Sequence, residues 1–350
     1  MGVATFLGRR AGGRKASFTD WLCYAYLAVA FLTIALPVVW LVLSSFKPES
    51  ELTQYPPTIL PNAPVLLEIE GQPRPLPAYT IEGREGVFGL RAQVGRIAVL
   101  IDPHPPHEQV RVEATTITRL AEPHLEVSNY TEPLTARLSA FDFPLFLYNS
   151  AFVTIVATIL SVVMNSMAGY ALSRYRFRSR MGFLLLVVFA LMIPQTVILV
   201  PLFLVVNSLA LYDTLWGAIL PVAATPVGIF LMRQYMLTLP EDLFEAARID
   251  GGSEWQLFWR IAVPLSMPAI AVLAILSVIW RWNDFLWPLI VLQRSENYTL
   301  QLGLNAFQGE FEVQWHYLLA MAVLSLLPVT LIFAFLQKSI TGGIATTGMK

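Results

Sequence analysis

The sequence predicts an all-α membrane protein of six transmembrane helices, with a small β-rich extracytoplasmic insert between the first and second helices. Three observations predict this fold class. Of the 350 residues, 56% are hydrophobic and 13% are charged, and a soluble chain of this length cannot bury so much apolar surface. Six apolar runs are each long enough for a membrane-spanning helix, which needs ~20 residues. A polar, proline-rich stretch, residues 48–142, separates the first run from the others.

The chain begins with a polar, basic tail and one long apolar run. Residues 1–19 are predicted to form a cytoplasmic N-terminal tail, and residues 20–47 the first transmembrane helix. Pro37 lies inside this helix and is tolerable there, because neighbouring groups in a membrane protein can satisfy the freed backbone. The run is too long for the core of a signal peptide and lacks a small-residue cleavage site, so we expect no cleaved leader.

Residues 48–142 are predicted to be the extracytoplasmic β-rich insert. Short apolar or alternating stretches between proline-rich turns are typical of strands. The strands that we expect cover residues 79–81, 88–90, 96–101 and 110–117.

We predict no metal, disulfide or nucleic-acid site. His104 and His107 flank two prolines, and a rigid turn with solvated histidines is favoured over a metal site because no third ligand stands at a fixed spacing. Cys23 is the single cysteine, so no internal disulfide can form. The formal net charge of −1 does not suggest a nucleic-acid partner.

Residues 143–337 are predicted to form the transmembrane core, and residues 338–350 a cytoplasmic C-terminal tail. Prolines in three of the core's runs predict kinked helices, and small residues around Gly169 permit close contact between helices. The five apolar runs are 146–172, 182–206, 214–236, 265–292 and 317–337.

Lysine and arginine set the expected orientation, because short cytoplasmic loops are enriched in them. With six spans, every strongly basic segment falls on one side, and this side is predicted to be cytoplasmic, with both termini. The short loops on the other side, 207–213 and 293–316, contain one base, Arg294. The basic segments are 1–19, 173–180, 237–263 and 338–350.

Residues 237–264 form the longest amphipathic, charged segment between apolar runs. They predict two short helices with a bend. Pro240 suits the first position of a helix, and Gly251 can end that helix in the left-handed conformation. Ser253 opens an S-x-x-Q capping box for the second helix, which we expect Pro264 to stop.

This segment is predicted to be a docking surface. It is too polar to cross a membrane, and its five acidic residues outnumber its two basic ones between positions 240 and 264, which suits a basic groove on a partner. The alternative is a hairpin lying on the lipid surface, although such helices are usually basic on their polar face. Its large apolar side chains are Leu243, Phe244, Trp255, Phe258 and Trp259, of which Leu243 and Phe244 are expected to share a face with Ala247.

The same segment resembles the EAA loop of the permeases of ABC importers. Glu245-Ala246-Ala247 is followed at the family's spacing by Gly251, Ile261 and Pro264, with Val263 where the family has leucine. In that family the loop is a cytoplasmic coupling helix that fits a cleft in the ATP-hydrolysing subunit. The resemblance implies these ATPase-coupling residues: Glu245, Ala246, Ala247, Asp250, Gly251 and Pro264.

Other segments resemble the sugar-importing branch, the second permease of maltose-type transporters. The resemblance covers roughly residues 20–47 and 143–350, and no matching motif lies in the insert. The resemblance implies a sugar or oligosaccharide importer in the bacterial cytoplasmic (inner) membrane. The implied partners are a second homologous permease, two copies of a cytoplasmic ATPase, an extracytoplasmic solute-binding protein and the bilayer. No cofactor is expected on this chain, with ATP and Mg²⁺ bound by the ATPase. The matching segments are 149–150, 168–177, 192–194, 201–203, 282–285 and, in altered form, 341–350.

Charged and aromatic residues lie within the apolar run 265–292, where a rise of ~1.5 Å per residue from Leu265 places them in the outer half of the bilayer. Arg281 and Asp284 stand three residues apart, which permits an ion pair, and charges inside a membrane are costly and usually functional. Trp282 could stack on a sugar ring and Asn283 could bind hydroxyls, although an interfacial aromatic belt explains the tryptophan equally well. Trp282, Asn283 and Asp284 are therefore predicted substrate-pathway residues, with a structural role as the alternative.

The sequence does not predict an enzyme. It contains no G-x-x-x-x-G-K-[ST] loop, no H-E-x-x-H motif and no G-x-S-x-G elbow, so a partner must supply the energy. Two other functions remain open. An ion-coupled secondary transporter of small polar solutes would need buried carboxylates and internal repeats, and Asp284 alone is available. A membrane scaffold would use the insert as its active part.

Overall fold

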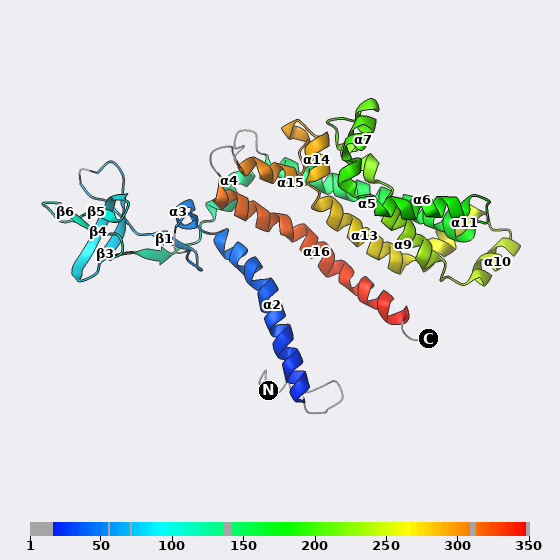
Figure 1. Ribbon diagram of the computed structural model, residues 1–350, viewed down its shortest axis with the longest axis horizontal. Coiled ribbons are helices and arrows are strands. Elements are labelled where there is room, and N and C mark those ends of the chain that lie inside the picture. The colour runs from blue at the N-terminus through cyan, green and yellow to red at the C-terminus, as the bar shows by residue number, and fades with distance from the viewer. Residues whose placement is uncertain (1–16, 55–56, 71, 136–141, 309–312, 348–350) are drawn as a thin grey trace. The chain divides into compact units, whose positions relative to one another are not determined.

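The computed structural model describes residues 17–54, 57–70, 72–135, 142–308 and 313–347, and the basic residues predicted for the N-terminal tail lie outside them. The chain divides into two compact units, Met1–Tyr130 with Gln314–Val323, and Thr131–Val313 with Leu324–Lys350. Figure 1 shows their elements along the colour ramp. The predicted fold class is confirmed in its coarser form: the chain is mostly helical, and a β-rich insert lies between its first long helix and the next.

The first unit opens with α2, Phe18–Ser44, which is apolar and largely exposed along its whole length. A helix that is apolar all round suits the bilayer. The Ser17 backbone N–H donates to the Asp20 carboxylate at 2.7 Å, which satisfies one of the free donors at the helix start. Pro37 lies inside the helix without ending it, as predicted.

The described residues of the insert form eight strands. Five follow the sheet order β2-β3-β4-β5-β6, β7 also pairs with β3, and β1 pairs with β8 separately. All pairings are antiparallel. Two short helices flank the strands, α3 (Glu49–Leu52) and α4 (Ser128–Thr135). The strands are β1 Asn62–Pro64, β2 Leu66–Leu67, β3 Leu76–Ile81, β4 Arg84–Val94, β5 Ile97–Ile101, β6 Gln109–Glu113, β7 Ile117–Arg119 and β8 Ala121–Pro123.

The strand predicted over 110–117 is wrong in its extent. β6 ends at Glu113, and Ile117 belongs to β7, which pairs with a different neighbour. Thr116 causes the turn, since its backbone N–H and its hydroxyl both donate to the carbonyl of Glu113, at 3.0 and 2.9 Å. Such local bonds compete with strand pairing. The strands expected over 79–81 and 88–90 lie within β3 and β4, and β5 covers the strand expected over 96–101 except Arg96, which is in the turn before it.

A buried ion pair ties the sheet to the chain that follows α2. Glu51 of α3 has a side chain that is 1% exposed and lies 3.2 Å from the guanidinium of Arg119 on β7. Thr58 donates to the same carboxylate at 3.0 Å, and Arg119 also donates to Gln54. The insert is therefore anchored to the segment just beyond α2 by charge as well as by strand pairing.

The second unit is helical and is built on α5, Phe143–Arg174. Asp142 caps its start by accepting from the Leu145 N–H at 3.1 Å, as N-cap residues do. The other helices are α6 Arg180–Met192, α7 Gln195–Ser208, α8 Leu215–Ile219, η1 Leu220–Val222, α9 Pro226–Met236, α10 Glu241–Ile249, α11 Glu254–Leu257, η2 Phe258–Ala262, α12 Val263–Leu265, α13 Met267–Trp282, α14 Leu286–Val291, η3 Ser295–Asn297, α15 Leu300–Leu304, η4 Asn305–Phe307 and α16 Trp315–Thr347, which begins in the first unit.

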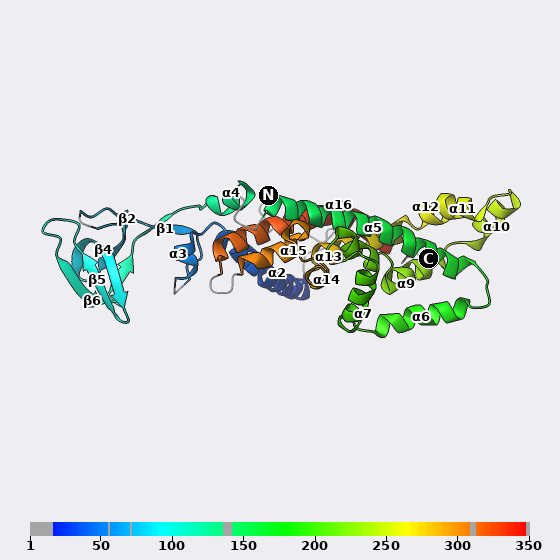
Figure 2. The same ribbon diagram turned by 90° about the horizontal axis from the view of Figure 1, so that it is seen from above.

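Two of the three spans predicted to be kinked, 182–206 and 214–236, are broken instead. In the third, Pro328 lies inside α16 without ending it. Among the described residues, three helices are long and apolar enough to cross a membrane unbroken, and there are up to six spans if each bent pair counts as one. The bends are 110° between α6 and α7, 42° between η1 and α9, and 78° between α12 and α13, and Figure 2 shows the first as two rods meeting at an angle. Pro194 and Pro226 stand at two of these breaks, because proline removes a helical hydrogen bond.

Two hydrophobic cores lie along α5. The first, here called the Trp287 core, surrounds the first half of α5 and includes Val153, Ala157, Ala218, Ile219, Trp287 and Val291. The second, the Phe244 core, surrounds the last turns of α5 and includes Tyr170, Met232, Met236, Phe244, Leu257 and Phe258. The charged segment 237–264 therefore contributes directly to one core of the helical unit.

Candidate coupling site

Residues 240–264, here called the coupling segment, fold largely as their local signals predict. α10 begins at Glu241, directly after Pro240. Gly251 has a φ of +82°, which is the left-handed conformation expected after a helix end. Ser253 forms the predicted capping box: its N–H donates to the Gln256 side chain at 2.9 Å, and its hydroxyl accepts from the Gln256 N–H at 3.4 Å.

The second helix ends at Leu265, one residue beyond Pro264, and a 78° bend separates it from α13. The chain stays helical from Glu254 to Leu265, with a π-helical stretch, η2, at Phe258–Ala262. Proline has no N–H and its ring collides with the carbonyl four residues earlier, and the wider π turn accommodates this defect. π-bulges of this kind are frequent at functional sites.

One face of the coupling segment is buried in the Phe244 core. Phe244, Leu257 and Phe258 are at most 3% exposed. The Tyr170 ring lies 6.3 Å from the Phe244 ring and 5.4 Å from the Phe258 ring. The Arg174 guanidinium lies over the Phe244 ring at 4.2 Å, a favourable cation–π contact. The segment therefore packs against the end of α5.

Polar contacts also hold the coupling segment against α5. Arg174 donates to the carbonyls of Met236 and Leu239 at 2.7 and 2.8 Å, just before the segment begins. Within the segment, Glu254 accepts from Arg248 at 2.9 Å. The sequence indicated Arg174 only as one of the bases that mark the cytoplasmic side, and its structural contacts depend on residues more than 60 positions away.

The opposite face exposes large apolar side chains. Ile249 is 86% exposed and Trp255 is 60% exposed, and Leu243 and Trp259 are also exposed. The expectation that Leu243 shares a face with Phe244 is therefore wrong: consecutive helix positions diverge, and the larger ring is buried. The two tryptophan rings lie 5.7 Å apart, edge to face. The segment therefore exposes large apolar side chains together with acids such as Glu245 and Asp250.

The residues assigned to coupling lie on or beside the exposed face. Glu245, Ala246, Asp250, Gly251 and Pro264 are exposed, and Ala247 is half-buried. The structure thus brings them together on one segment, while the residues predicted for the substrate pathway lie elsewhere.

Those predicted pathway residues make internal contacts at the end of α13. Trp282 is 4% exposed, and its indole N–H donates to the Ser325 carbonyl at 2.9 Å. Asn283 is exposed, and its amide donates to the Ile279 carbonyl at 2.8 Å. Asp284 accepts from the Trp287 N–H at 3.3 Å. The expected ion pair with Arg281 does not form among the described residues, because the Arg281 guanidinium instead donates to the Val222 carbonyl at 2.6 Å.

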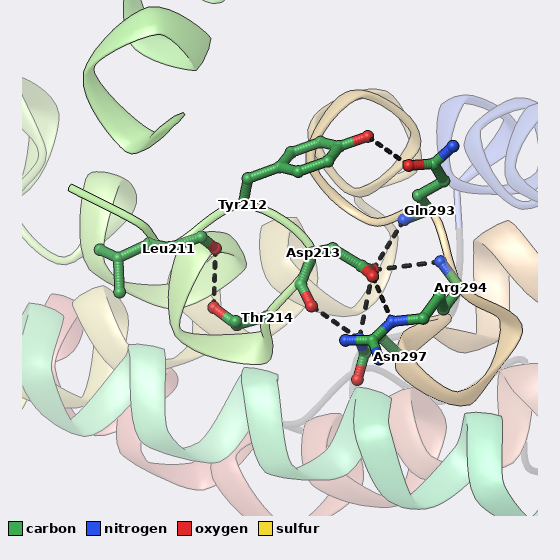
Figure 3. Close-up of polar contacts among 7 residues, drawn as sticks. All are labelled: Leu211, Tyr212, Asp213, Thr214, Gln293, Arg294 and Asn297. Atoms are coloured by element: carbon green, nitrogen blue, oxygen red, sulfur yellow. Dashed lines mark hydrogen bonds and ion pairs between the residues drawn. The ribbon is translucent and has the colours of Figure 1, made fainter. Parts of the chain in front are cut away.

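A second polar cluster, which the sequence did not predict, fastens two loops together. Asp213, between α7 and α8, accepts from the backbone N–H groups of Gln293 and Arg294 at 2.9 and 3.1 Å. The Arg294 guanidinium and the Asn297 amide also donate to it, as Figure 3 shows. Burial alone would raise the pKa of Asp213, but these four donors outweigh burial and hold its pKa well below the ordinary range.

Comparison with known proteins identifies the family. Residues 157–345 match the family described as the binding-protein-dependent transport system inner membrane component. The chain belongs to this family. It is therefore a multi-pass permease component of an inner-membrane transport system, as the EAA resemblance predicted, and the alternatives of an ion-coupled transporter and a scaffold have no support.

Named relatives of this permease are transport subunits. It is 40% identical over 202 residues to the arabinooligosaccharides transport system permease protein AraQ of Halalkalibacterium halodurans, covering 58% of this chain and 72% of that protein. It is 32% identical over 225 residues to the sn-glycerol-3-phosphate transport system permease protein UgpE of Agrobacterium fabrum, covering 63% and 80%. A solved chain from a bacterial ABC transporter that imports the acidic polysaccharide alginate shares the fold, with a TM-score of 0.66 and 22% identity over 93% of this chain and 99% of that one.

Proposed function

We propose that this permease is the membrane subunit of an ATP-driven importer and that its coupling segment is the docking surface for the ATPase. One observation carries the proposal. The segment buries Phe244 and Phe258 in its own permease but exposes Ile249 and Trp255, although its charges keep it out of the bilayer. Apolar side chains that neither the protein core nor lipid covers mark a protein interface.

The contacts of the coupling segment would transmit movement from the ATPase to the membrane-spanning helices. A displaced coupling segment would carry Phe244 with it, and Phe244 packs on Tyr170 and beneath Arg174 of α5. Arg174 also holds the carbonyls that follow α9. Movement of a docked ATPase would therefore be transmitted to α5 and α9 together. ATP and Mg²⁺ would be bound by the ATPase, with no cofactor on this chain.

A sugar or oligosaccharide is the proposed cargo. The most similar relatives named above transport arabinooligosaccharides and, at lower identity, sn-glycerol-3-phosphate, and both cargoes are rich in hydroxyl groups. Asn283 and Asp284 remain proposed pathway residues because an amide and a carboxylate bind hydroxyls. Trp282 fits the structural alternative better, since its ring is buried and its N–H is already used.

The proposed topology has six spans, with both termini and the coupling segment in the cytoplasm. The proposed segment bounds are those predicted from the sequence. They are the tail 1–19, the first helix 20–47, the extracytoplasmic insert 48–142, the permease core 143–337 with the coupling loop 237–264, and the tail 338–350. A second homologous permease, two ATPase copies and a solute-binding protein would complete the importer, which would lie in the bacterial cytoplasmic membrane.

A pull-down from membranes tests the docking proposal. We expect the ATPase to co-purify with the parent chain and to be lost or much weakened with Glu245→Lys, which reverses the charge of an exposed side chain on α10. Glu85→Lys is the matched control, because Glu85 is also exposed but lies in the insert. Retention of the ATPase by Glu245→Lys, or equal loss with both variants, would contradict docking at this segment.

A further inference from the structure

The break between η1 and α9 leaves two backbone groups without helical partners. Pro226 opens α9 and has no N–H, so the carbonyl of Val222, four residues earlier, has no helical donor. The Thr225 N–H lies just outside the helix and has no partner within it. Polar backbone groups left unpaired in an apolar environment are costly.

Side chains from two neighbouring helices satisfy these groups. Arg281 of α13 donates to the Val222 carbonyl at 2.6 Å. Asn165 of α5 is fully buried, and its side-chain oxygen accepts from the Thr225 N–H at 2.9 Å. The Asn165 amide also donates to the hydroxyls of Ser161 at 2.8 Å and Thr225 at 3.4 Å. Both unpaired backbone groups at the break are thus hydrogen-bonded by side chains of other helices.

The first turn of α9 lies close to Asn165, and a glycine permits this approach. A Cβ added to Gly228 would lie 2.5 Å from the Asn165 amide nitrogen. The Gly228 N–H donates to the Thr225 hydroxyl at 3.1 Å, which caps α9. Glycine is therefore needed where the broken span passes the asparagine, and Asn165 lies against the break rather than near it.

The break also separates the two cores. Ala218 and Ile219, on the α8 side, belong to the Trp287 core. Met232 and Met236, on the α9 side, belong to the Phe244 core, together with the coupling segment. Each half of the broken span is therefore packed with a different set of partners.

We infer that residues 222–226 form a hinge, about which α9 and the coupling segment move as one body relative to α8 and the Trp287 core. Asn165 and Arg281 are its positioning residues, because they hold the open backbone groups in the resting geometry. The inference rests on the proposed ATPase docking, which would supply the force. Hydrogen bonds made by side chains can be exchanged during a movement, whereas an unbroken helix would have to unwind.

Distances between spin labels test the hinge in the complete transporter. Cys23 is the single cysteine, so Cys23→Ser gives a clean background. One label pair, at Leu220 and Gln234, spans the break, and the control pair, at Leu220 and Leu286, lies on the Trp287 side; all three positions are exposed. Between the nucleotide-free and the ATP–vanadate-trapped transporter, we expect the distance across the break to shift and the control distance to stay constant.

Variants separate positioning from mere folding. In the nucleotide-free transporter, Asn165→Ala and Arg281→Met should show a second population of the Leu220–Gln234 label distance, at the value seen in the trapped state. Arg281→Lys keeps a donor and should show the parent's distance distribution. If the ATPase co-purifies with the parent chain but the distance across the break does not change, the hinge is wrong and docking stands. If no ATPase co-purifies with the parent, docking fails and the hinge fails with it.

Discussion

The hydroxyl of Tyr170 donates a hydrogen bond to Oε2 of Glu254, 3.0 Å away, and this contact joins α5 to the coupling segment. The other carboxylate oxygen of Glu254 accepts from Arg248 on α10. One carboxylate therefore links both helices of the coupling segment to the membrane-spanning core. The Tyr170 ring adds packing against Phe244 and Phe258.

Tyr170→Phe isolates the hydrogen bond, because the ring and its packing remain. Hydrogen bonds to charged groups contribute about 1.5–3 kcal/mol, so we expect a measurable loss of thermal stability. We also expect transport by the assembled importer to fall more than ATPase binding, since docking itself is untouched. Tyr148→Phe is the control, because Tyr148 is an exposed tyrosine on the same helix. Equal effects of both substitutions would exclude a specific role for the Tyr170 hydroxyl.

Gly169→Ala tests the close contact of α5 with α9. An added Cβ would lie 2.7 Å from the Met232 Cβ and 2.9 Å from the Arg233 backbone nitrogen, so the helices must separate. Overpacking of this kind costs about 1–3 kcal/mol. We expect a lower unfolding temperature in detergent. Gly182→Ala should be neutral or slightly stabilising, because nothing lies within 4 Å of a Cβ there and alanine favours helix. A neutral Gly169→Ala would show that the contact is looser than described.

Glu51→Ala tests the anchoring of the insert. The substitution leaves Arg119, with a side chain 13% exposed, without its carboxylate, and breaking a buried pair from one side costs about 3–5 kcal/mol. We expect faster proteolysis within residues 62–123 in the otherwise intact chain. Glu85→Ala, at an exposed site of the same sheet, should cleave at the parent rate. Unchanged cleavage of Glu51→Ala would mean that strand pairing alone holds the insert.

Asp213 predicts a dependence of stability on pH. Because the folded state holds its pKa below the ordinary value, its ionised form stabilises the fold above the pKa of the unfolded chain, about 4. The contribution is lost as pH falls below that value towards the folded pKa. We therefore expect Asp213→Asn to lower the unfolding temperature at pH 7 and to differ progressively less from the parent below about pH 4. A constant difference at all pH values would rule out this charge as the cause.

Local signals were sufficient for much of the coupling segment. Gly251 and the Ser253 capping box were predicted because each acts within a few residues. The helix stop expected at Pro264 falls one residue later, at Leu265, and the π-helical stretch before it was not predicted. In the same way, apolar composition located the spans but could not show that two of them break.

Contacts between distant residues could not be predicted from one sequence. Asn165 and Thr225 are 60 positions apart, and Asp213 and Arg294 are 81 apart. No local motif marks any of these side chains, and the packing of whole helices alone determines its partner. Arg281 and Asp284 show the opposite case, since their favourable spacing suggested an ion pair that the fold replaces with other partners.

Photo-crosslinking from Ala246 tests the central proposal most directly. This side chain is exposed on α10, so a photoreactive residue there should leave the Phe244 core undisturbed. In intact membranes we predict a covalent adduct with the ATPase, and none from Ser208, an exposed position at the end of α7. An ATPase that co-purifies with the labelled permease but crosslinks from Ser208 and not from Ala246 would contradict docking at the coupling segment.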